Sequence, residues 1–415
     1  MLTQWFDPEP TFKGLVFARA LRDEGHEVEV VTGFPNYPGG RLFPGYKIRP
    51  WQREQIDGVR VLRVPLYPSH DSSPLLRSLN YLSFSASAAL LGALLTKKPD
   101  VIYVTHPPIT VGVAATFLGW TKRAPFVYDM LDLWPDALAA SGMAGGRVVR
   151  LVGFICDWVY RRAAFLVVES PGFQQVLVKR GVPKHKLGVI LNWCDERSLV
   201  LEPDPAVRAS LSAGERFNVV FAGTMGRAQG LESVLQAAEL LATADPRVQF
   251  VFVGGGLEVE PLRRSASARG SSNVIFLPRM PMSAIGRVLE AADVLLVHLK
   301  DDPLFEITVP GKTQAYLSVG KPILMALRGD AADIVSASGG GITCRPADPE
   351  DLARAVTVLA AMPPEELRAM GQRGRDYYRA QMSLQVGTRK FLEVFEQVVS
   401  GTPARSDAGP DPRSA

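Results

Sequence analysis

The amino-acid sequence predicts an α/β protein with two doubly wound parallel-sheet domains, and three observations support this. Short apolar runs alternate with helical patterns along the whole chain. The runs are rich in valine, isoleucine and leucine without a clean polar–apolar alternation, which is typical of strands covered on both faces. The same alternation occurs in both halves of the 415 residues, a length sufficient for two domains with their own cores.

We expect six strands in each half of the chain. In the first half they are residues 28–32, 59–64, 101–105, 126–131, 165–169 and 187–191. In the second half they are residues 218–222, 249–253, 274–277, 294–299, 322–327 and 341–344. Segment 229–242 represents the helices between them, because its apolar residues recur at helical spacing. Two more helices, 364–381 and 384–399, follow the last strand.

The domain boundary is expected within 192–216, a stretch with prolines and charges and no convincing strand. We therefore assign residues 1–195 to an N-terminal domain and 196–400 to a C-terminal domain that includes the terminal helices. Residues 401–415 are polar and proline-rich, and we expect a disordered tail. Only Met1–Trp5 precede the first turn, so the central first strand is either short or begins upstream of Met1.

Composition excludes several classes of protein. The hydrophobic fraction of 47% and charged fraction of 21% are ordinary for a soluble globular chain. A net charge of +4 suits an anionic ligand or membrane surface and falls short of a nucleic-acid-binding arm. Three distant cysteines form no disulfide framework, so a cytoplasmic setting is expected. We expect no signal peptide, and the apolar stretch 82–95 is shorter than the roughly 20 residues of a membrane span.

Two glycine-containing turns, one after the short first strand at Met1–Trp5 and one after the expected strand 218–222, are candidate anion sites. In the first domain, turn 7–14 ends at Gly14, which lets a ligand approach a helix N-terminus. In the second domain, Gly223 and Gly226 open the backbone, and Arg227 offers a planar fork to a phosphate. The alternative in both places is an ordinary turn.

Two further stretches of the second domain could hold a nucleotide. Gly254 and Gly255 follow a strand and present bare backbone to a base or ribose, although a loose turn is the alternative. Pro310 and Gly311 begin a helix, and Lys312 lies in its first turn. Backbone N–H groups, the helix dipole and an ammonium together suit a diphosphate. The alternative is that Lys312 is a plain surface lysine.

The order and spacing of these motifs resemble the retaining glycosyltransferases of family 4, which have the GT-B fold. The motifs are Gly223…Arg227…Gly230, Val253-Gly-Gly-Gly256, Pro310-Gly-Lys312 and Gly320-Lys-Pro322. In the first domain, residues 25–30, 32–39, 132–135 and 192–195 look like the WbuB-like branch, which serves O-antigen, capsule and exopolysaccharide assembly. The resemblance covers residues 1 to about 400 and implies two Rossmann-like domains with an interdomain cleft.

The resemblance also implies roles for single residues. Arg227 and Lys312 would hold the diphosphate of a nucleotide-sugar, with UDP the expected nucleotide, and Glu306 would contact the donor sugar. Asp132 would lie near the reacting carbon, and these four form the expected catalytic set. The expected donor-binding set is Gly14, Gly223, Gly226, Gly254, Gly255, Arg279, Met280, Pro310, Gly311 and Gln314, in which Arg279 and Met280 contact the base through their backbone. On the acceptor side the candidates are His106, for which a capped turn is the alternative, and Tyr37.

The chain departs from the family pattern in two ways. The usual Arg…Lys pair of the glycine loop is Arg227 followed by Gln229, so one cation is missing. The usual second glutamate, eight positions after Glu306, is Gln314, or Ala315 when counted back from Gly320. Gln314 could accept a ribose hydroxyl through its amide oxygen, and Ala315 could not. A UDP-N-acetylglucosamine 2-epimerase-like isomerase and an inactive nucleotide-sugar-binding protein are the alternative functions.

The acceptor implied by the resemblance is a glycan or a polyprenyl-diphosphate-linked saccharide. Segment 67–84 mixes Arg77 with the apolar residues Leu75, Leu76, Leu79, Tyr81, Leu82 and Phe84. With Arg41, Lys47 and Arg49 it could contact anionic headgroups at the inner face of the cytoplasmic membrane, or the apolar set could be core. We expect no nucleic acid, no cofactor and no metal, because no His, Cys or Asp cluster has ligand spacing. His298 and Trp134 are expected in the core.

Overall fold

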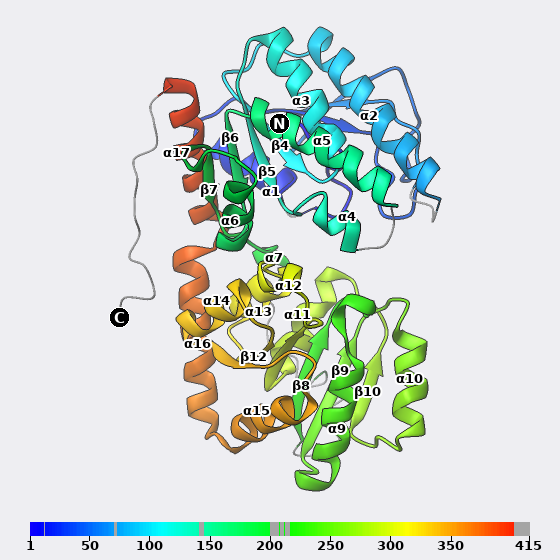
Figure 1. Ribbon diagram of the computed structural model, residues 1–415, viewed down its shortest axis with the longest axis vertical. Coiled ribbons are helices and arrows are strands. Elements are labelled where there is room, and N and C mark those ends of the chain that lie inside the picture. Colours follow the sequence, from blue (N-terminus) through cyan, green and yellow to red (C-terminus); the bar gives the residue numbers. More distant parts are fainter. Residues whose placement is uncertain are drawn as a thin grey trace. The chain divides into compact units, whose positions relative to one another are not determined.

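A computed structural model describes residues 1–11, 13–69, 73–140, 145–199, 207, 211 and 216–401 (Figure 1). The chain divides into two compact units, each described here by itself. The first unit contains Met1–Leu191 and the last helix from Gly387 on, and the second contains Asn192–Val386. Residues 402–415 of the predicted tail lie outside the described residues.

The second unit has a six-stranded, fully parallel sheet in the order β10-β9-β8-β11-β12-β13. Its strands are β8 (Phe217–Ala222), β9 (Val248–Val253), β10 (Val274–Leu277), β11 (Val294–His298), β12 (Ile323–Ala326) and β13 (Gly341–Cys344). The strand order reverses between β8 and β11. In open α/β sheets, ligands bind beyond the carboxyl ends of the strands at such a reversal.

Every residue of β9 and β11 is buried, because helices cover both faces of this sheet. The helices are α7 (Glu196–Leu199), α9 (Glu232–Ala244), α10 (Val259–Ala268), α11 (Met282–Ala291), α12 (Pro303–Glu306), α13 (Gly311–Val319), α14 (Asp330–Ser338), α15 (Pro349–Ala361) and α16 (Pro364–Gln381). One core layer joins apolar residues of α9 and α15 to those of β8 and β9. The helical pattern predicted at 229–242 corresponds to α9.

The described residues of the first unit form seven strands in two groups, ordered β1-β3-β2 and β4-β5-β6-β7. They are β1 (Glu29–Gly33), β2 (Gln52–Ile56), β3 (Val59–Val64), β4 (Ile102–His106), β5 (Phe126–Met130), β6 (Phe165–Val168) and β7 (Leu187–Val189). Leu2 forms parallel bridges to both Val31 of β1 and Val104 of β4. The N-terminal residues therefore join the two groups at the point where the strand order reverses.

The helices of the first unit are α1 (Leu15–Asp23), α2 (Pro74–Leu95), α3 (Ile109–Lys122), α4 (Asp136–Ala140), α5 (Gly146–Arg162), α6 (Pro171–Lys179) and α17 (Leu384–Ser400). Helix α3 contacts both α2 and α5. Glycines allow these close approaches, since Gly92 of α2 faces Leu118 of α3, and Gly112 of α3 faces Val159 of α5. The three helices thus form one layer, seen in blue to green in Figure 1.

The last helix corrects the predicted domain assignment. We expected α17 to belong with the second sheet, yet most of it belongs to the first unit. The physical reason is an aromatic cluster: the Phe391 ring lies 5.1 Å from that of Phe17 and 5.5 Å from that of Tyr103, measured between centroids. The hydrophobic pattern predicted the helix, but it could not show that the helix packs against the first unit.

All twelve predicted strands are present, and the sequence missed only β2 among the described strands. This strand pairs antiparallel with β3 at the edge of its group, and its residues Gln-Arg-Glu-Gln-Ile are mostly polar. An edge strand without a buried face has no apolar run, so the pattern that identified the other strands does not occur in it.

Helix α2 is more apolar and more exposed than predicted. By length and composition it is the one described helix that could cross a membrane, and 28% of its apolar window within Leu75–Leu95 is buried. The alternative that segment 67–84 is core holds only in part: Phe84 is buried, while Leu75, Leu79 and Leu82 are exposed.

A buried ion pair links the turn before helix α1 to β5 of the first unit. The Lys13 ammonium lies 2.6 Å from a carboxylate oxygen of Asp129 on β5, and both side chains are 1% exposed. The Tyr103 hydroxyl donates to the same oxygen at 2.5 Å, and the ammonium also lies 5.0 Å from the Phe391 ring centroid. These contacts compensate the cost of placing two charges in the interior.

We predict that Lys13→Met strongly destabilises the first unit. The variant leaves the Asp129 carboxylate buried without its ammonium partner, which costs roughly 3–5 kcal/mol. Urea unfolding followed by tryptophan fluorescence measures this, because five of the six tryptophans lie in the first unit. Lys98→Met, at an exposed lysine, is the control and should change the free energy of unfolding by less than about 0.5 kcal/mol. Equal stability of the two variants would contradict the prediction.

Candidate functional site

Two glycine loops meet at the carboxyl ends of β8 and β9. Gly223 follows β8, and its N–H donates to the Val253 carbonyl at 2.8 Å. Gly254 has φ +145°, and a Cβ there would overlap the Gly223 carbonyl oxygen. Gly256 likewise lies against the Met225 backbone, whose N–H donates to the Gly255 carbonyl at 2.8 Å. The glycines are therefore needed for close contact between the two loop backbones after β8 and β9, next to the strand-order reversal.

Side chains hold the loop from Gly223 to Gly230 in shape. The Gln229 amide oxygen accepts from the Gly226 N–H at 2.9 Å, and the Gln229 carbonyl lies 2.6 Å from Nδ1 of His298. His298 also contacts the Ser233 hydroxyl at 3.0 Å. Burial lowers the pKa of His298 to about 4, so the ring is neutral at pH 7. The prediction of a satisfied core histidine is confirmed, and Gln229 has a structural role where the family has a cation.

Lys312 lies against the end of β8 and is not a plain surface lysine. Its Nζ is 3.3 Å from the centroid of the Phe221 ring. Its Cε is 2.8 Å from the position that a Cβ of Gly223 would take. Burial lowers the pKa of the ammonium to about 7. The structure thus brings together Lys312, the start of α13 and the bare backbone of Gly223, three features that the sequence placed in one site.

Tyr316 fixes this arrangement and was missed by the sequence analysis. Its hydroxyl accepts from the Ala222 N–H at 2.9 Å and donates to the Ala222 carbonyl at 3.2 Å. Tyr316 follows Lys312 by four residues, one helical turn, so both point to the same side of α13. That spacing is the signal that could have identified it.

Gln314 does not present its side chain to a ligand in this structure. The side chain is 1% exposed. With its amide nitrogen turned toward the carbonyls of Pro310 and Gly311, it donates to them at 2.8 Å and 3.1 Å. The predicted contact with a ribose is therefore wrong for this conformation. The amide is used to complete the first turn of its own helix.

Arg227 and Glu306 both remain on the surface. The Arg227 side chain is 88% exposed, with Nε 3.6 Å from a carboxylate oxygen of Glu258. Glu306 ends α12 with an exposed side chain, while its backbone packs on Gly329. Among the described residues, no ion pair or hydrogen bond joins either one to Lys312. Both are free to turn toward a ligand, and Glu258 is an additional polar neighbour that the sequence did not indicate.

The predicted base-contacting loop lies beside the second glycine loop. The Gly254 N–H donates to the Leu277 carbonyl at 3.2 Å. Cβ of Arg279 is 3.9 Å from the position that a Cβ of Gly255 would take. Arg279 is exposed and Met280 is half-buried. These segments are therefore neighbours, as a shared nucleotide contact requires.

In the first unit the predicted ligand seat at Gly14 is already filled. An Asp7 carboxylate oxygen accepts from the Leu15 N–H at 2.7 Å, and a Cβ on Gly14 would overlap that oxygen. The positive end of α1 is thus satisfied by the chain's own carboxylate. The assignment of Gly14 to donor binding is corrected accordingly.

The two candidates near the end of β4 and β5 differ sharply. His106 has no exposed surface, its Nδ1 lies 2.9 Å from the Tyr128 hydroxyl, and its ring packs edge-on against Trp134. Burial lowers its pKa to about 3, so it is neutral, and the predicted acceptor contact is wrong here. Asp132 has an exposed surface, yet the protein around its carboxyl group restricts its solvation and raises its pKa to about 6.

Tyr37 belongs to an aromatic group with Trp5 and Tyr81. The rings of Tyr37 and Trp5 have centroids 4.8 Å apart, and those of Trp5 and Tyr81 are 6.4 Å apart. Glu9, which is 2% exposed, accepts from the N–H groups of Tyr37 and Asn36 at 2.8 Å. Burial raises the pKa of Glu9 to about 7. The sequence analysis missed this buried carboxyl, because an acidic residue in a turn usually faces solvent.

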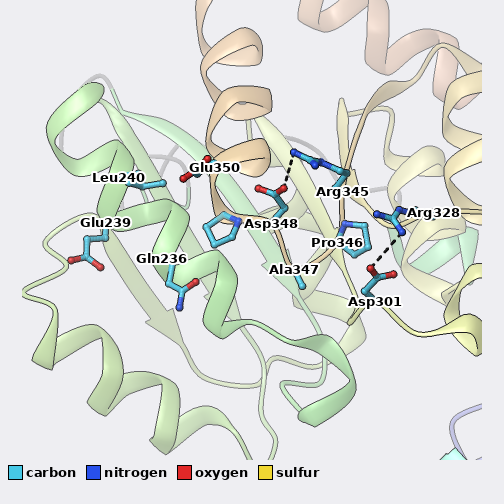
Figure 2. Close-up of a pocket in the computed structure, with 11 residues that line it drawn as sticks. Gln236, Glu239, Leu240, Asp301, Arg328, Arg345, Pro346, Ala347, Asp348 and Glu350 are labelled. Atoms are coloured by element: carbon cyan, nitrogen blue, oxygen red, sulfur yellow. Dashed lines mark ion pairs between the residues drawn. The ribbon is translucent and has the colours of Figure 1, made fainter.

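An open depression of about 770 Å³ elsewhere in the second unit contains none of the predicted site residues (Figure 2). Arg345 pairs with Asp348 at 2.8 Å, and Arg328 with Asp301 at 3.5 Å. Because both cations already face carboxylates, the depression is a poor anion site. In the described part of the chain, no three His, Cys, Asp or Glu residues are grouped closely enough to hold a metal.

Comparison with known proteins assigns both halves of the chain. The family described as "Glycosyl transferase 4-like domain" matches residues 15–193, and "Glycosyl transferases group 1" matches residues 205–377. The chain is 28% identical over 314 residues to the putative colanic acid biosynthesis glycosyl transferase WcaI of Escherichia coli, covering 72% of this chain and 75% of the relative. It is 24% identical over 311 residues to the probable glycosyltransferase WbjE of Pseudomonas aeruginosa, covering 73% and 76%.

Solved structures agree on the fold. HepE of Anabaena, in complex with UDP and glucose, matches with a TM-score of 0.67 and 16% identity, covering 95% of this chain and 98% of that one. An α,α-trehalose-phosphate synthase of Burkholderia vietnamiensis matches with a TM-score of 0.71 and 15% identity, covering 95% and 99%. At these identities the likeness shows the GT-B fold.

We predict that Lys312→Met stabilises the empty protein in a pH-dependent way. The pKa of Lys312 is about 7 when folded and 10.5 in the reference state, so folding disfavours the ammonium. The cost is fully present below pH 7, and it disappears as the pH rises from 7 to 10.5. Lys312→Met should therefore melt above wild type at pH 6, with a difference that shrinks toward pH 10. Lys300→Met, at an exposed lysine, should show no such trend. A pH-independent difference would contradict the prediction.

Proposed function

Because this chain is a family 4 glycosyltransferase with the GT-B fold, we propose that it transfers a sugar from a UDP-sugar, with retention, to a glycan or polyprenyl-diphosphate-linked acceptor during surface polysaccharide synthesis. The names of WcaI and WbjE support the glycosyl transfer, and that of WcaI supports the polysaccharide. The UDP and UDP-glucose complexes of HepE support the nucleotide.

The placement of Lys312 is the observation that carries the proposal. Its ammonium stands at the N-terminus of α13, against the bare backbone of Gly223 and over the Phe221 ring. N–H groups at a helix start and a nearby cation both bind a diphosphate. Their interaction with it is stronger in a partly buried site than it would be in water. An ammonium whose pKa is lowered by burial is poorly solvated, so an incoming anion meets little competition from water.

These groups also suit the chemistry of the leaving group. As the bond from the anomeric carbon to the diphosphate oxygen breaks, negative charge grows on UDP. Lys312, Arg227 and the α13 N–H groups stabilise that charge, and such electrostatic stabilisation is usually the largest catalytic contribution. The role needs no metal ion. Glu306 is proposed to contact the donor sugar, and Asp132 and Tyr37 to lie on the acceptor side.

Acceptor dependence separates this function from the alternatives. A transferase releases UDP from its donor much faster when acceptor is present. An isomerase forms an epimer of the sugar without acceptor, and an inactive binding protein does neither. Incubation of the protein with UDP-sugars, with and without polyprenyl-diphosphate-linked saccharides, distinguishes the three by UDP release and sugar identity.

We predict that substitutions divide the site into nucleotide-binding and sugar-binding residues. Arg227→Ala and Lys312→Ala each remove a charge-assisted bond worth roughly 1.5–3 kcal/mol, which is about 10- to 150-fold in UDP affinity. Glu306→Gln should bind UDP nearly normally and lose kcat, because its contact belongs mainly to the transition state. Calorimetry with UDP and turnover assays measure both quantities, and Arg264→Ala is an exposed control. If Lys312→Ala binds UDP with the affinity of wild type, the proposed diphosphate site is wrong.

We also predict that UDP binding takes up a proton above neutral pH. At pH 8 the Lys312 ammonium, with a pKa of about 7, is mostly deprotonated in the empty protein. A bound diphosphate raises that pKa, so nearly one proton enters per UDP. The calorimetric enthalpy should then differ between phosphate and Tris buffers. The difference should vanish in Lys312→Ala and persist in Arg227→Ala. Equal enthalpies for wild type in both buffers would place the diphosphate elsewhere.

A further inference from the structure

The first unit has an apolar surface over the layer of α2, α3 and α5. We call this surface the three-helix face, and we infer that it binds an anionic lipid bilayer. Its exposed apolar residues are Leu75, Leu79, Leu82, Leu90 and Leu94 of α2, Phe117 and Trp120 of α3, and Val148, Leu151, Phe154 and Trp158 of α5. The inference does not depend on the proposed activity, since lipid binding is measured without a donor.

Helix α5 shows the property most clearly. Leu151 is 60% exposed and Phe154 68%, and with Val148 and Trp158 they form one stripe along the helix. Cys156, Val159 and Tyr160, on the other side of the helix, are buried in the unit. The helix is thus apolar both toward the protein and toward its surroundings. A helix that faced only water would carry polar residues on its outer stripe.

The neighbouring helices extend the apolar surface. Trp120 at the end of α3 is 78% exposed, and Leu75 at the start of α2 is 81% exposed. Because α3 contacts both α2 and α5, these residues belong to one layer of the unit (Figure 1). So many exposed apolar side chains on three neighbouring helices are unusual on a protein surrounded by water and indicate an interaction site.

The charges of the three helices identify the partner. They carry the six cations Arg77, Lys122, Arg147, Arg150, Arg161 and Arg162, and the single anion Asp157. The whole chain is nearly balanced, with 46 basic and 42 acidic residues. Apolar side chains bordered by arginines are the composition of helices that lie in the headgroup region of anionic membranes.

The position of the arginines on α5 fits such a surface. Arg147 and Arg150 lie near the start of α5, on either side of Val148, and Arg161 and Arg162 end the helix. The Arg162 guanidinium lies 5.8 Å from the centroid of the Trp158 ring. Tryptophan and arginine both place an apolar body at the lipid boundary and a polar group among the headgroups.

The packing of α2 favours contact in the plane of the membrane over a transmembrane helix. Phe84 and Ala88 are buried, and the Ser85 hydroxyl donates to the Thr110 carbonyl at 2.7 Å. The Ser87 hydroxyl donates to the Pro65 carbonyl at 2.5 Å. These contacts hold α2 against the rest of the first unit, so its exposed leucines can enter the lipid while its other side stays on the protein.

A second copy of the chain is a less suitable partner. In a symmetric dimer the same arginines of both subunits would approach one another, because an isologous interface brings each patch against itself. A nucleic acid would match the arginines but not the leucines. Only a bilayer with anionic headgroups complements both the charge and the apolar side chains.

Flotation of the full chain with lipid vesicles tests the inference. Wild type should bind vesicles of phosphatidylcholine and phosphatidylglycerol at low salt, and bind less at high salt or with phosphatidylcholine alone. Leu151→Glu/Phe154→Glu should lower binding at least tenfold. Val358→Glu, at a valine 51% exposed on α15, is the matched control and should bind as wild type. Arg147→Glu/Arg150→Glu should lower binding by about five-fold or more per residue, and Arg264→Glu should not.

Calorimetry with UDP is done on every variant, because an unchanged UDP affinity shows that the second unit is folded. Circular dichroism and tryptophan fluorescence report on the first. Three results would overturn the inference: no vesicle binding by wild type, undiminished binding by Leu151→Glu/Phe154→Glu with a native spectrum, or a dimer that this variant disperses while neither form binds vesicles. The last result would assign the three-helix face to a second copy. Failure of UDP binding alone would count against the proposed function and not against this inference.

Discussion

The hydrogen bonds between the Tyr316 hydroxyl and the peptide groups of Ala222 hold together the geometry of the proposed donor site. They join α13 to the last residue of β8, so the helix start cannot move without the strand end. One turn earlier on the same side of the helix, Lys312 is then placed over Phe221 and against Gly223. Because Gly223 also contacts Gly254, the second loop depends on the same anchor. A site built this way is ordered before any ligand arrives, which reduces the entropy lost on binding.

Burial explains how much of this could be predicted from the sequence. Strands covered on both faces need continuous apolar runs, so β8 and eleven other strands could be predicted from such runs in the sequence. Strand β2 is polar and pairs only at an edge, so it left no such pattern. The neighbourhood of Lys312 and Gly223 was predictable because both follow strand ends that meet at one edge of a parallel sheet.

The failed predictions concern side chains whose partners the residue pattern does not reveal, whether these partners are near in the chain or distant. Gly14 looked open, but its space is taken by Asp7, whose direction depends on the turn between them. Gln314 looked available for a ribose, but its amide bonds to the carbonyls of its own helix start. His106 looked like a strand-end ligand, and the packing of Trp134 and Tyr128 encloses it. A single sequence states which residue types are present and not which of them face each other.

The place of α17 affects the order in which the chain can fold. The first unit is completed only by residues after Gly387, whereas the 195 residues from Asn192 to Val386 form the second unit without interruption. At a synthesis rate of about 5–20 residues per second, the ribosome needs roughly 10–40 s to make that intervening segment. During this time the first 191 residues wait with Phe17 and Tyr103 lacking the Phe391 ring that covers them. The half of the protein that is made first is therefore finished last, and it is the half most exposed to chaperones and to aggregation during synthesis.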